Sequence, residues 1–260
     1  MDLALIIGIL LAFGSLFVMV TLEGVHVESL LLPAPIVLVF GATLAVGLAG
    51  TTIRDALAAV RALPTVFIGK TEKPDEVVDN LVAIAEKARA EGLLSLEEDA
   101  AEATDPFLAA ALQNIADGTD GEDLRMLLED QIRGATKASM QSAKFYKSLG
   151  GYAPTVGIIG TVVSLTHVLE NLDTPETLGP SIAAAFVATL WGLLSANFMW
   201  LPIGDRLIRL ANIELEIMEL KLEGVLAIQS GSQPRLLRER LQAMLPRTAP
   251  ARKKEPTAVE

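Results

Sequence analysis

The stretch IAAAFVATLWGLLSANFMWLPI, residues 182–203, contains no Asp, Glu, Lys or Arg. A helix of about 20 apolar residues is long enough to cross the hydrocarbon core of a bilayer. Charged side chains are costly at that depth, so their absence is typical of a helix that faces lipid. The stretch therefore predicts a membrane-spanning helix.

Three further stretches have the same character: residues 3–22, roughly 30–49 and roughly 152–169. Four such runs explain how a chain with 20% charged residues has a mean hydropathy of +0.45, because charge and apolar residues occupy separate segments. The alternative, buried helices of a soluble protein, does not account for four runs of membrane length. We expect an all-α integral membrane protein with four transmembrane helices.

Basic residues set the expected orientation. None of the 21 Lys and Arg residues lies in 23–29 or 170–180; eleven lie in 51–150 and the rest follow Pro202. Segments rich in Lys and Arg stay in the cytoplasm. Both termini, a helical domain between the second and third spans, and a C-terminal helix are therefore expected on the cytoplasmic side. Asp2, with no basic residue before the first run, favours a retained helix over a signal peptide.

Several function classes are excluded by composition. A net charge of −11 argues against nucleic-acid binding, and the chain has no cysteine for disulfides or thiolate metal sites. His26 and His167 lack the spacing of metal ligands. No P-loop, HExxH or nucleophile-elbow motif is present. We therefore expect neither an enzyme nor a cofactor.

The cytoplasmic segments have helical patterning. A helix is expected after Pro74 and should stop at Gly92, and Ser95 with Glu98 fits a capping box. A turn is expected at 117–121. Further helices are expected at 122–148, leading into the third span, and at 207–228. From Pro246 onward the composition predicts disorder.

The third and fourth spans carry small residues at helical spacing, which allow membrane helices to approach closely. These candidate packing residues are Gly157 and Gly160 on the third span and Ala184, Ala188, Gly192 and Ala196 on the fourth.

Two threonines and two prolines in these spans have a functional and a purely structural interpretation. Thr161 and Thr189 lie near mid-membrane and could line an ion path, or could bond their own helix backbone. Pro154 and Pro202 lie near the cytoplasmic ends and could act as hinges, or simply bend the helices. Because no ionisable group lies mid-span, an ion-carrying carboxylate would have to come from another chain.

The third-span run from Gly150 to Thr161 resembles that of the MotA/PomA family of flagellar stator proteins. The fourth-span run 185–192, Pro202 and the later run 223–231 are similar to that family as well. The opening residues 2–8 and the turn at Asp117 also fit, so the resemblance covers nearly the whole chain.

The resemblance implies an inner-membrane stator subunit that conducts protons or sodium ions and turns the flagellar rotor. Family members form a ring of five copies around two copies of a MotB or PomB partner, whose aspartate carries the ion. The cytoplasmic face of the ring acts on the rotor protein FliG. The ion itself, H⁺ or Na⁺, stays open, because proton-using relatives can also carry both threonines.

The resemblance also assigns roles to residues. Thr161 and Thr189 match ion-path positions, and Pro154 and Pro202 match the coupling prolines. Arg89 and Glu97 match the charged pair that contacts the rotor. The expected domains are transmembrane helices 1–2 (1–52), a rotor-contacting domain (53–150), the ion-path helices (151–204), and a C-terminal helix with a disordered tail (205–260).

Three rival functions make different demands on the sequence. An ExbB/TolQ-type energiser of another envelope process resembles this chain in its last two spans, but typically has three spans and an external N-terminus. A self-contained secondary transporter would need charged groups or a broken-helix site in its own spans. A structural membrane scaffold would give no reason for the paired prolines and threonines.

Overall fold

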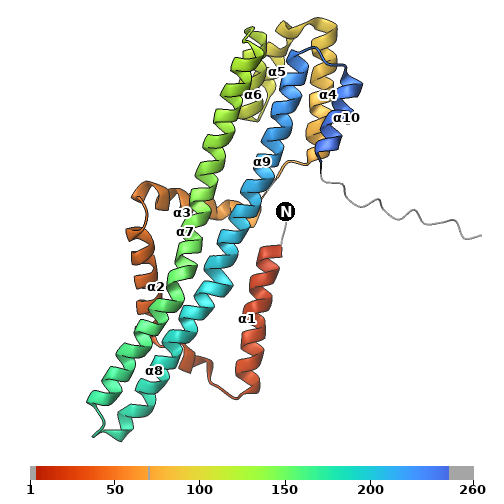
Figure 1. The fold of residues 1–260 in the computed structure, drawn as a ribbon. Coiled ribbons are helices and arrows are strands. Elements are labelled where there is room, and N and C mark those ends of the chain that lie inside the picture. Colours follow the sequence, from red (N-terminus) through yellow and green to blue (C-terminus); the bar gives the residue numbers. More distant parts are fainter. Residues whose placement is uncertain (1–3, 70, 246–260) are drawn as a thin grey trace, which may run out of the picture. The chain divides into compact units, whose positions relative to one another are not determined.

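The computed structural model describes residues 4–69 and 71–245, and within them all regular structure is helical (Figure 1). The elements in chain order are α1 (Ala4–Leu22), η1 (Val27–Leu30), α2 (Pro33–Ala49), α3 (Ile53–Ile68), α4 (Pro74–Glu91), η2 (Leu93–Ser95), α5 (Leu96–Glu102), α6 (Pro106–Ala116), α7 (Gly121–Glu170), α8 (Pro175–Leu194), η3 (Ser195–Trp200), α9 (Leu201–Gln229) and α10 (Pro234–Met244). The predicted all-α class is confirmed. Asp2 and the tail from Pro246 lie outside the described residues.

The chain forms two compact units. The first unit contains residues 1–71 and 135–213, and the second contains 72–134 and 214–260. Helices α7 and α9 each contribute to both units, so each unit is discontinuous in sequence. The predicted domains end at residues 52, 150 and 204, where the chain is expected to enter or leave the membrane. Compactness does not test these membrane borders, so they stay predictions.

Membrane-spanning character is concentrated in the first unit. Among the described residues, three helical segments are long and apolar enough to cross a membrane: Ala4–Leu22, Gly121–Glu170 and Pro175–Gln229. On α1 only Val20 is fully buried, and side chains such as Leu10, Leu11 and Phe17 are exposed, so much of the apolar surface of this helix is left for lipid or for other chains. The chain is thus an all-helical protein with several long apolar segments.

The second predicted span is shorter than expected. It was predicted to begin near residue 30, but α2 begins at Pro33 and has 17 residues. Residues Val27–Leu30 form a 3-10 turn instead, and Leu32 is extended before the proline. A proline favours the first helical position and disfavours a helical residue before it, which explains the later start.

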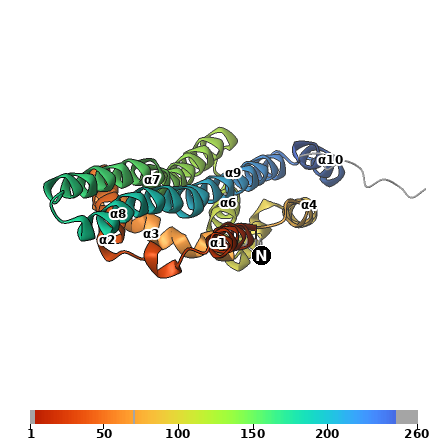
Figure 2. The same cartoon turned by 90° about the horizontal axis from the view of Figure 1, so that it is seen from below.

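The third and fourth predicted spans are parts of longer helices. Helix α7 runs without a break for 50 residues, so the expected helix before the third span is confirmed. Helix α8 passes through a π-helical turn, η3, directly into α9. Both views show α7 and α8 running side by side (Figures 1 and 2).

The core of the first unit lies where α3 packs against α7 and α9. It contains Ala59, Val66, Leu149 and Leu207. The buried Tyr146 hydroxyl donates a hydrogen bond to the carbonyl oxygen of Ala59 at 3.1 Å. This bond satisfies the one polar group of a large side chain inside an apolar cluster.

The core of the second unit is built from leucines on its separate helices. The fully buried side chains include Leu81 of α4, Leu96 of α5, Leu112 of α6, Leu124 of α7, Leu220 of α9 and Leu237 of α10. Burying one leucine contributes roughly 1.5–3 kcal/mol. Helices α6 and α10, which we did not predict, are therefore parts of the core.

Two local predictions in this unit are confirmed and one is wrong. Helix α4 begins at Pro74 and ends before Gly92, whose φ is 90°. The turn at 117–121 is present, with Gly118 at φ 78°. The capping box is absent, because Ser95 already has helical dihedral angles and its hydroxyl donates to the carbonyl of Gly92 at 2.7 Å. Glu98 pairs with Lys87 instead.

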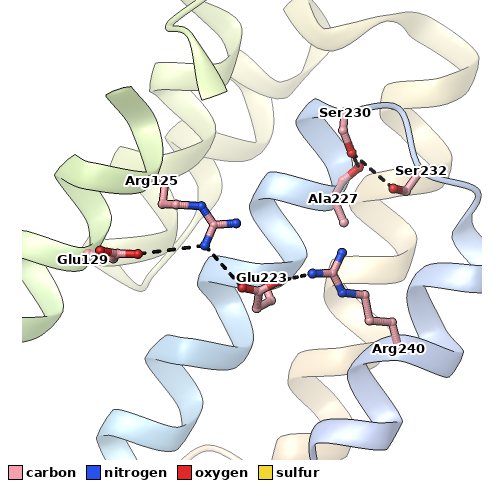
Figure 3. A network of polar contacts seen from close by, with 7 residues as sticks. All are labelled: Arg125, Glu129, Glu223, Ala227, Ser230, Ser232 and Arg240. Carbon is pink, nitrogen blue, oxygen red and sulfur yellow. Dashed lines mark hydrogen bonds and ion pairs between the residues drawn. The ribbon is translucent and has the colours of Figure 1, made fainter. Parts of the chain in front are cut away.

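Charged side chains join three helices of the second unit (Figure 3). Glu223 of α9 accepts from Arg240 of α10 and lies 3.6 Å from Arg125 of α7. Arg125 also lies 3.9 Å from Glu129. One carboxylate thus bridges two helices that are far apart in sequence.

Candidate functional site

Helices α7 and α8 approach each other closely at two glycines. A Cβ atom added at Gly157 would lie 2.8 Å from the carbonyl oxygen of Ala188 and 3.2 Å from the Cα of Gly192. A Cβ added at Gly192 would lie 2.7 Å from the carbonyl oxygen of Ala153. The nearest atoms belong to the backbone and cannot move aside as a side chain can. Only glycine therefore fits at both positions.

The small-residue stripe of α8 continues around this contact. A Cβ added at Gly160 would lie 2.7 Å from the Cβ of Ala188. Ala188 and Ala196 are buried, while Ala184 is half-buried. This geometry fits the predicted role of these residues in helix packing. Whether the packing matters for function stays a prediction.

The two threonines meet at this contact. The Thr161 hydroxyl lies 3.0 Å from the carbonyl oxygen of Ala185 on α8 and 3.2 Å from that of Gly157 on its own helix. It also hydrogen-bonds the hydroxyl of Thr189. A hydroxyl has one proton to donate and two lone pairs to accept with. The pair therefore bridges the two helices and still has lone pairs available.

This arrangement can coordinate an ion but cannot ionise. Threonine and carbonyl oxygens are suitable ligands for hard cations. No Asp, Glu, Lys, Arg or His occurs in residues 153–166 of α7 or in residues 177–204. A proton or a cation passing here would need a charged partner group from outside these segments.

The two prolines sit in different helical surroundings. Pro154 lies inside α7, which continues through it. Pro202 is the second residue of α9 and follows the π-helical turn η3. Wide π turns relieve the backbone conflict that a proline creates. The side-chain amide of Asn197 donates to the carbonyl of Leu193 at 2.9 Å, which satisfies a backbone group near this irregularity.

Arg89 and Glu97 lie on what we call the tip, residues 89–97, where α4 turns into η2 and α5. Arg89 is in the last turn of α4 and Glu97 in the first turn of α5, and both are exposed. Among the residues that the structure describes, neither forms an ion pair. Both charges are thus available to another molecule.

A neighbouring lysine holds the tip in shape. The Lys87 ammonium lies 2.9 Å from carboxylate oxygens of both Glu98 and Asp99. Its hydrogen bond to Glu98, together with its contact with the Asp99 carboxylate, raises the pKa of Lys87 above the usual 10.5. Because the pKa of Lys87 is higher in the folded than in the unfolded chain, its pairing stabilises the fold fully at every pH below 10.5. This stabilisation is lost only as the pH rises through the folded-state pKa and the ammonium loses its proton. The pairing of Lys87 with Glu98 and Asp99 is therefore intact at neutral pH.

A buried lysine that sequence reasoning missed organises the second unit. The side chain of Lys221 is only 6% exposed and pairs with Glu72 at 2.6 Å and Asp105 at 2.7 Å. Asp105 also caps α6 by accepting from the backbone N–H groups of Phe107 and Leu108. Asp105 followed by Pro106 is a recognisable helix start. The position of Lys221, between two leucines, was the only sign of its burial.

We expect Lys221→Met to lower the melting temperature of the detergent-solubilised protein. Methionine keeps the length of the side chain but leaves two carboxylates without their counterion. Since both carboxylates are partly exposed and can rehydrate, the expected cost is about 1–3 kcal/mol. Arg235→Met, at a side chain that is 91% exposed, is the matched control and should leave the melting temperature unchanged. An unchanged melting temperature for Lys221→Met would show that the pair does not stabilise the unit.

Comparison with known proteins gives matches over most of the chain. Residues 99–220 match the model of the MotA/TolQ/ExbB proton channel family, and residues 6–92 match that of the motility protein A N-terminal region. Motility protein A of Bacillus subtilis (strain 168) is 32% identical over 251 residues, covering 95% of this chain and 92% of that protein. Chemotaxis protein PomA of Vibrio alginolyticus is 30% identical, over a match that covers 91% of this chain and 92% of that protein.

Solved structures agree with these matches. The structure of C. jejuni MotAB is similar with a TM-score of 0.91 at 28% identity, covering 96% of this chain and 98% of that chain. The structure of the flagellar MotAB stator complex from Bacillus subtilis is similar with a TM-score of 0.83 at 30% identity, and the match covers 93% of this chain and 95% of that chain. The chain thus has the MotA-like fold, and the resemblance noted in its sequence is confirmed. It belongs to the MotA/PomA family of flagellar motor stator proteins, which are membrane ion channels and not enzymes.

Proposed function

We propose that this chain works with a MotB/PomB-type partner to carry protons or sodium ions across the inner membrane, and that the ion flow turns the flagellar rotor. One observation carries the proposal. Two threonine hydroxyls meet between tightly packed helical segments, residues 153–166 and 177–204, that contain no ionisable side chain. An ion path of this kind needs a carboxylate from a second chain, and the similar solved structures are MotAB complexes.

The proposed topology has four crossings with both termini in the cytoplasm. Its second crossing is α2, whose 17 residues reach about 26 Å at 1.5 Å per residue, slightly less than a hydrocarbon core of about 30 Å. The distribution of Lys and Arg supports the orientation. In this topology residues 53–150 and 205–260 are cytoplasmic, and 151–204 contain the ion path.

The proposed assembly is a ring of five copies around two partner chains. The apolar surface of α1, and exposed side chains such as Ile158 and Phe186 on α7 and α8, provide area for contact with lipid and with other chains. We assign Arg89 and Glu97 to the contact with FliG, because both are exposed and unpaired within the described part of the chain. Pro154 and Pro202 would pass changes at the threonine pair to the cytoplasmic ends of these helices.

Swimming speed tests the proposal. A strain lacking this gene should regain swimming when the chain is restored with its MotB-like partner, in either sodium-free or sodium-rich medium. Dependence on sodium would identify the coupling ion. Flagellated cells whose swimming never depends on this gene would contradict the stator role and favour an ExbB/TolQ-type energiser.

Arg89→Glu is expected to reduce swimming severalfold without reducing the amount of protein in the membrane. The side chain is exposed and unpaired in the described structure, so its loss should not disturb the fold. Charges on such surfaces act together and mainly set encounter and register. A compensating Asp or Glu to Lys change on the rotor should restore part of the speed. Normal swimming of the single variant would count against the assigned contact.

A further inference from the structure

Two large apolar side chains project from the tip into solvent. Leu94 is 72% exposed and Leu93 is 36% exposed, whereas Leu96 in the following turn is fully buried. Isolated exposed leucines are ordinary on protein surfaces. These two, however, are adjacent and lie between Arg89 and Glu97, the charges assigned above to the rotor contact. Leu96, not Leu94, anchors the tip to its own core.

The tip presents these leucines on a fixed backbone. Gly92, at φ 90°, allows the chain to leave α4 sharply. The Ser95 hydroxyl and amide both donate to the Gly92 carbonyl, at 2.7 Å and 3.2 Å. Lys87 ties the end of α4 to the start of α5. A surface held in this way loses little conformational freedom when it binds.

The charges around the leucines fall into two groups. Lys87, Glu98 and Asp99 are paired with each other. Arg89, which precedes the leucines in the chain, and Glu97, which follows them, have no ion partner within the described residues. Exposed apolar side chains accompanied by polar groups that have no partner in the chain fit the apolar core and polar rim of protein-binding surfaces.

We propose that Leu93 and Leu94 are the apolar anchor of the rotor contact. This inference rests on the proposed function. The partner that fits is a rotor subunit with an apolar depression flanked by an acidic group opposite Arg89 and a basic group opposite Glu97. The charges steer and orient the encounter. Burial of Leu94 supplies the part of the binding that salt does not screen.

Salt dependence separates the two contributions. The complex of the full chain with its MotB-like partner would be purified, and its affinity for FliG measured at about 0.05 M and about 0.5 M salt, where screening differs severalfold. Leu94→Ala should weaken binding about tenfold at both salt concentrations, as expected for losing most of a buried leucine contact. Arg89→Ala should weaken binding mainly at low salt.

Leu236→Ala is the matched control. Leu236 is a 60% exposed leucine on α10, in the same unit but outside the tip, and its replacement should leave binding unchanged. Leu94→Met keeps an apolar side chain and should restore most of the affinity. Cells with Leu94→Ala should swim poorly while keeping normal amounts of the protein in the membrane.

Several results would overturn the inference. Binding of Leu94→Ala equal to that of the parent, or a defect that disappears at high salt, would show that the contact is electrostatic alone. Loss of the assembled complex in Leu94→Ala and Leu94→Met would show that the leucine contacts a second copy of this chain instead. If the unaltered chain restores swimming but Leu94→Ala swims normally, only this inference falls. If the unaltered chain fails to restore swimming, the proposed function itself falls.

Discussion

Gly192→Val is expected to abolish swimming and to lower the melting temperature of the purified protein. The new Cβ would lie 2.7 Å from the carbonyl oxygen of Ala153 and 3.1 Å from the Cα of Gly157. Both atoms belong to the backbone of α7, so the two helices would have to separate. Overpacking of this kind costs about 1–3 kcal/mol. Separation would also pull the Thr161 and Thr189 hydroxyls apart, and the functional effect should therefore exceed the loss of stability.

The chain offers a control on the same helix. A Cβ at Gly179 of α8 has no atom within 4 Å in the described structure, so Gly179→Ala should swim normally. Gly192→Ala, with a single added methyl group, should fall between the control and Gly192→Val. Normal swimming of Gly192→Val would mean that the close approach of α7 and α8 is not required in the working motor.

Thr161→Val is expected to reduce ion flow and swimming speed about tenfold or more, since each 1.4 kcal/mol of lost stabilisation along the path is tenfold in rate. Valine has nearly the same shape as threonine but cannot hydrogen-bond. The Thr189 hydroxyl and the Ala185 carbonyl would each lose a partner. Thr161→Ser keeps a hydroxyl at the same position and should retain most of the speed.

The structural interpretation of this threonine is tested by a neighbour on the same helix. Within the described part of the chain, Thr166 bonds only the carbonyl of Val162 in α7, at 2.9 Å. Thr166→Val should therefore leave swimming unchanged. If Thr161→Val swims as fast as Thr166→Val, the threonine pair is a packing feature and the ion passes elsewhere. Proton or sodium flux in reconstituted vesicles, compared at equal amounts of protein, is the direct measurement.

Local sequence features predicted the helices well where a single signal dominated. Pro74 and Gly92 mark the ends of α4, because proline favours the first helical turn and glycine accepts the positive φ that ends the helix. The capping box predicted at Ser95 is wrong because Ser95 is the last residue of the 3-10 turn η2 and already has helical dihedral angles, whereas an N-cap residue is extended. Helix α2 was placed three residues too early, because hydropathy does not register where a proline lets a helix begin.

The sequence by itself determined the membrane class, the family and the residue types at the candidate site. Hydropathy, charge distribution and short motifs are properties of neighbouring residues, so they can be read without knowing the fold. Only the tertiary structure decided which groups meet: Thr161 with Thr189, 28 positions apart, and Lys221 with Asp105, 116 positions apart. It also decided that Leu96 is buried while Leu94 is exposed. Such contacts depend on how closely helices pack and on which face each presents, and a local pattern does not contain either.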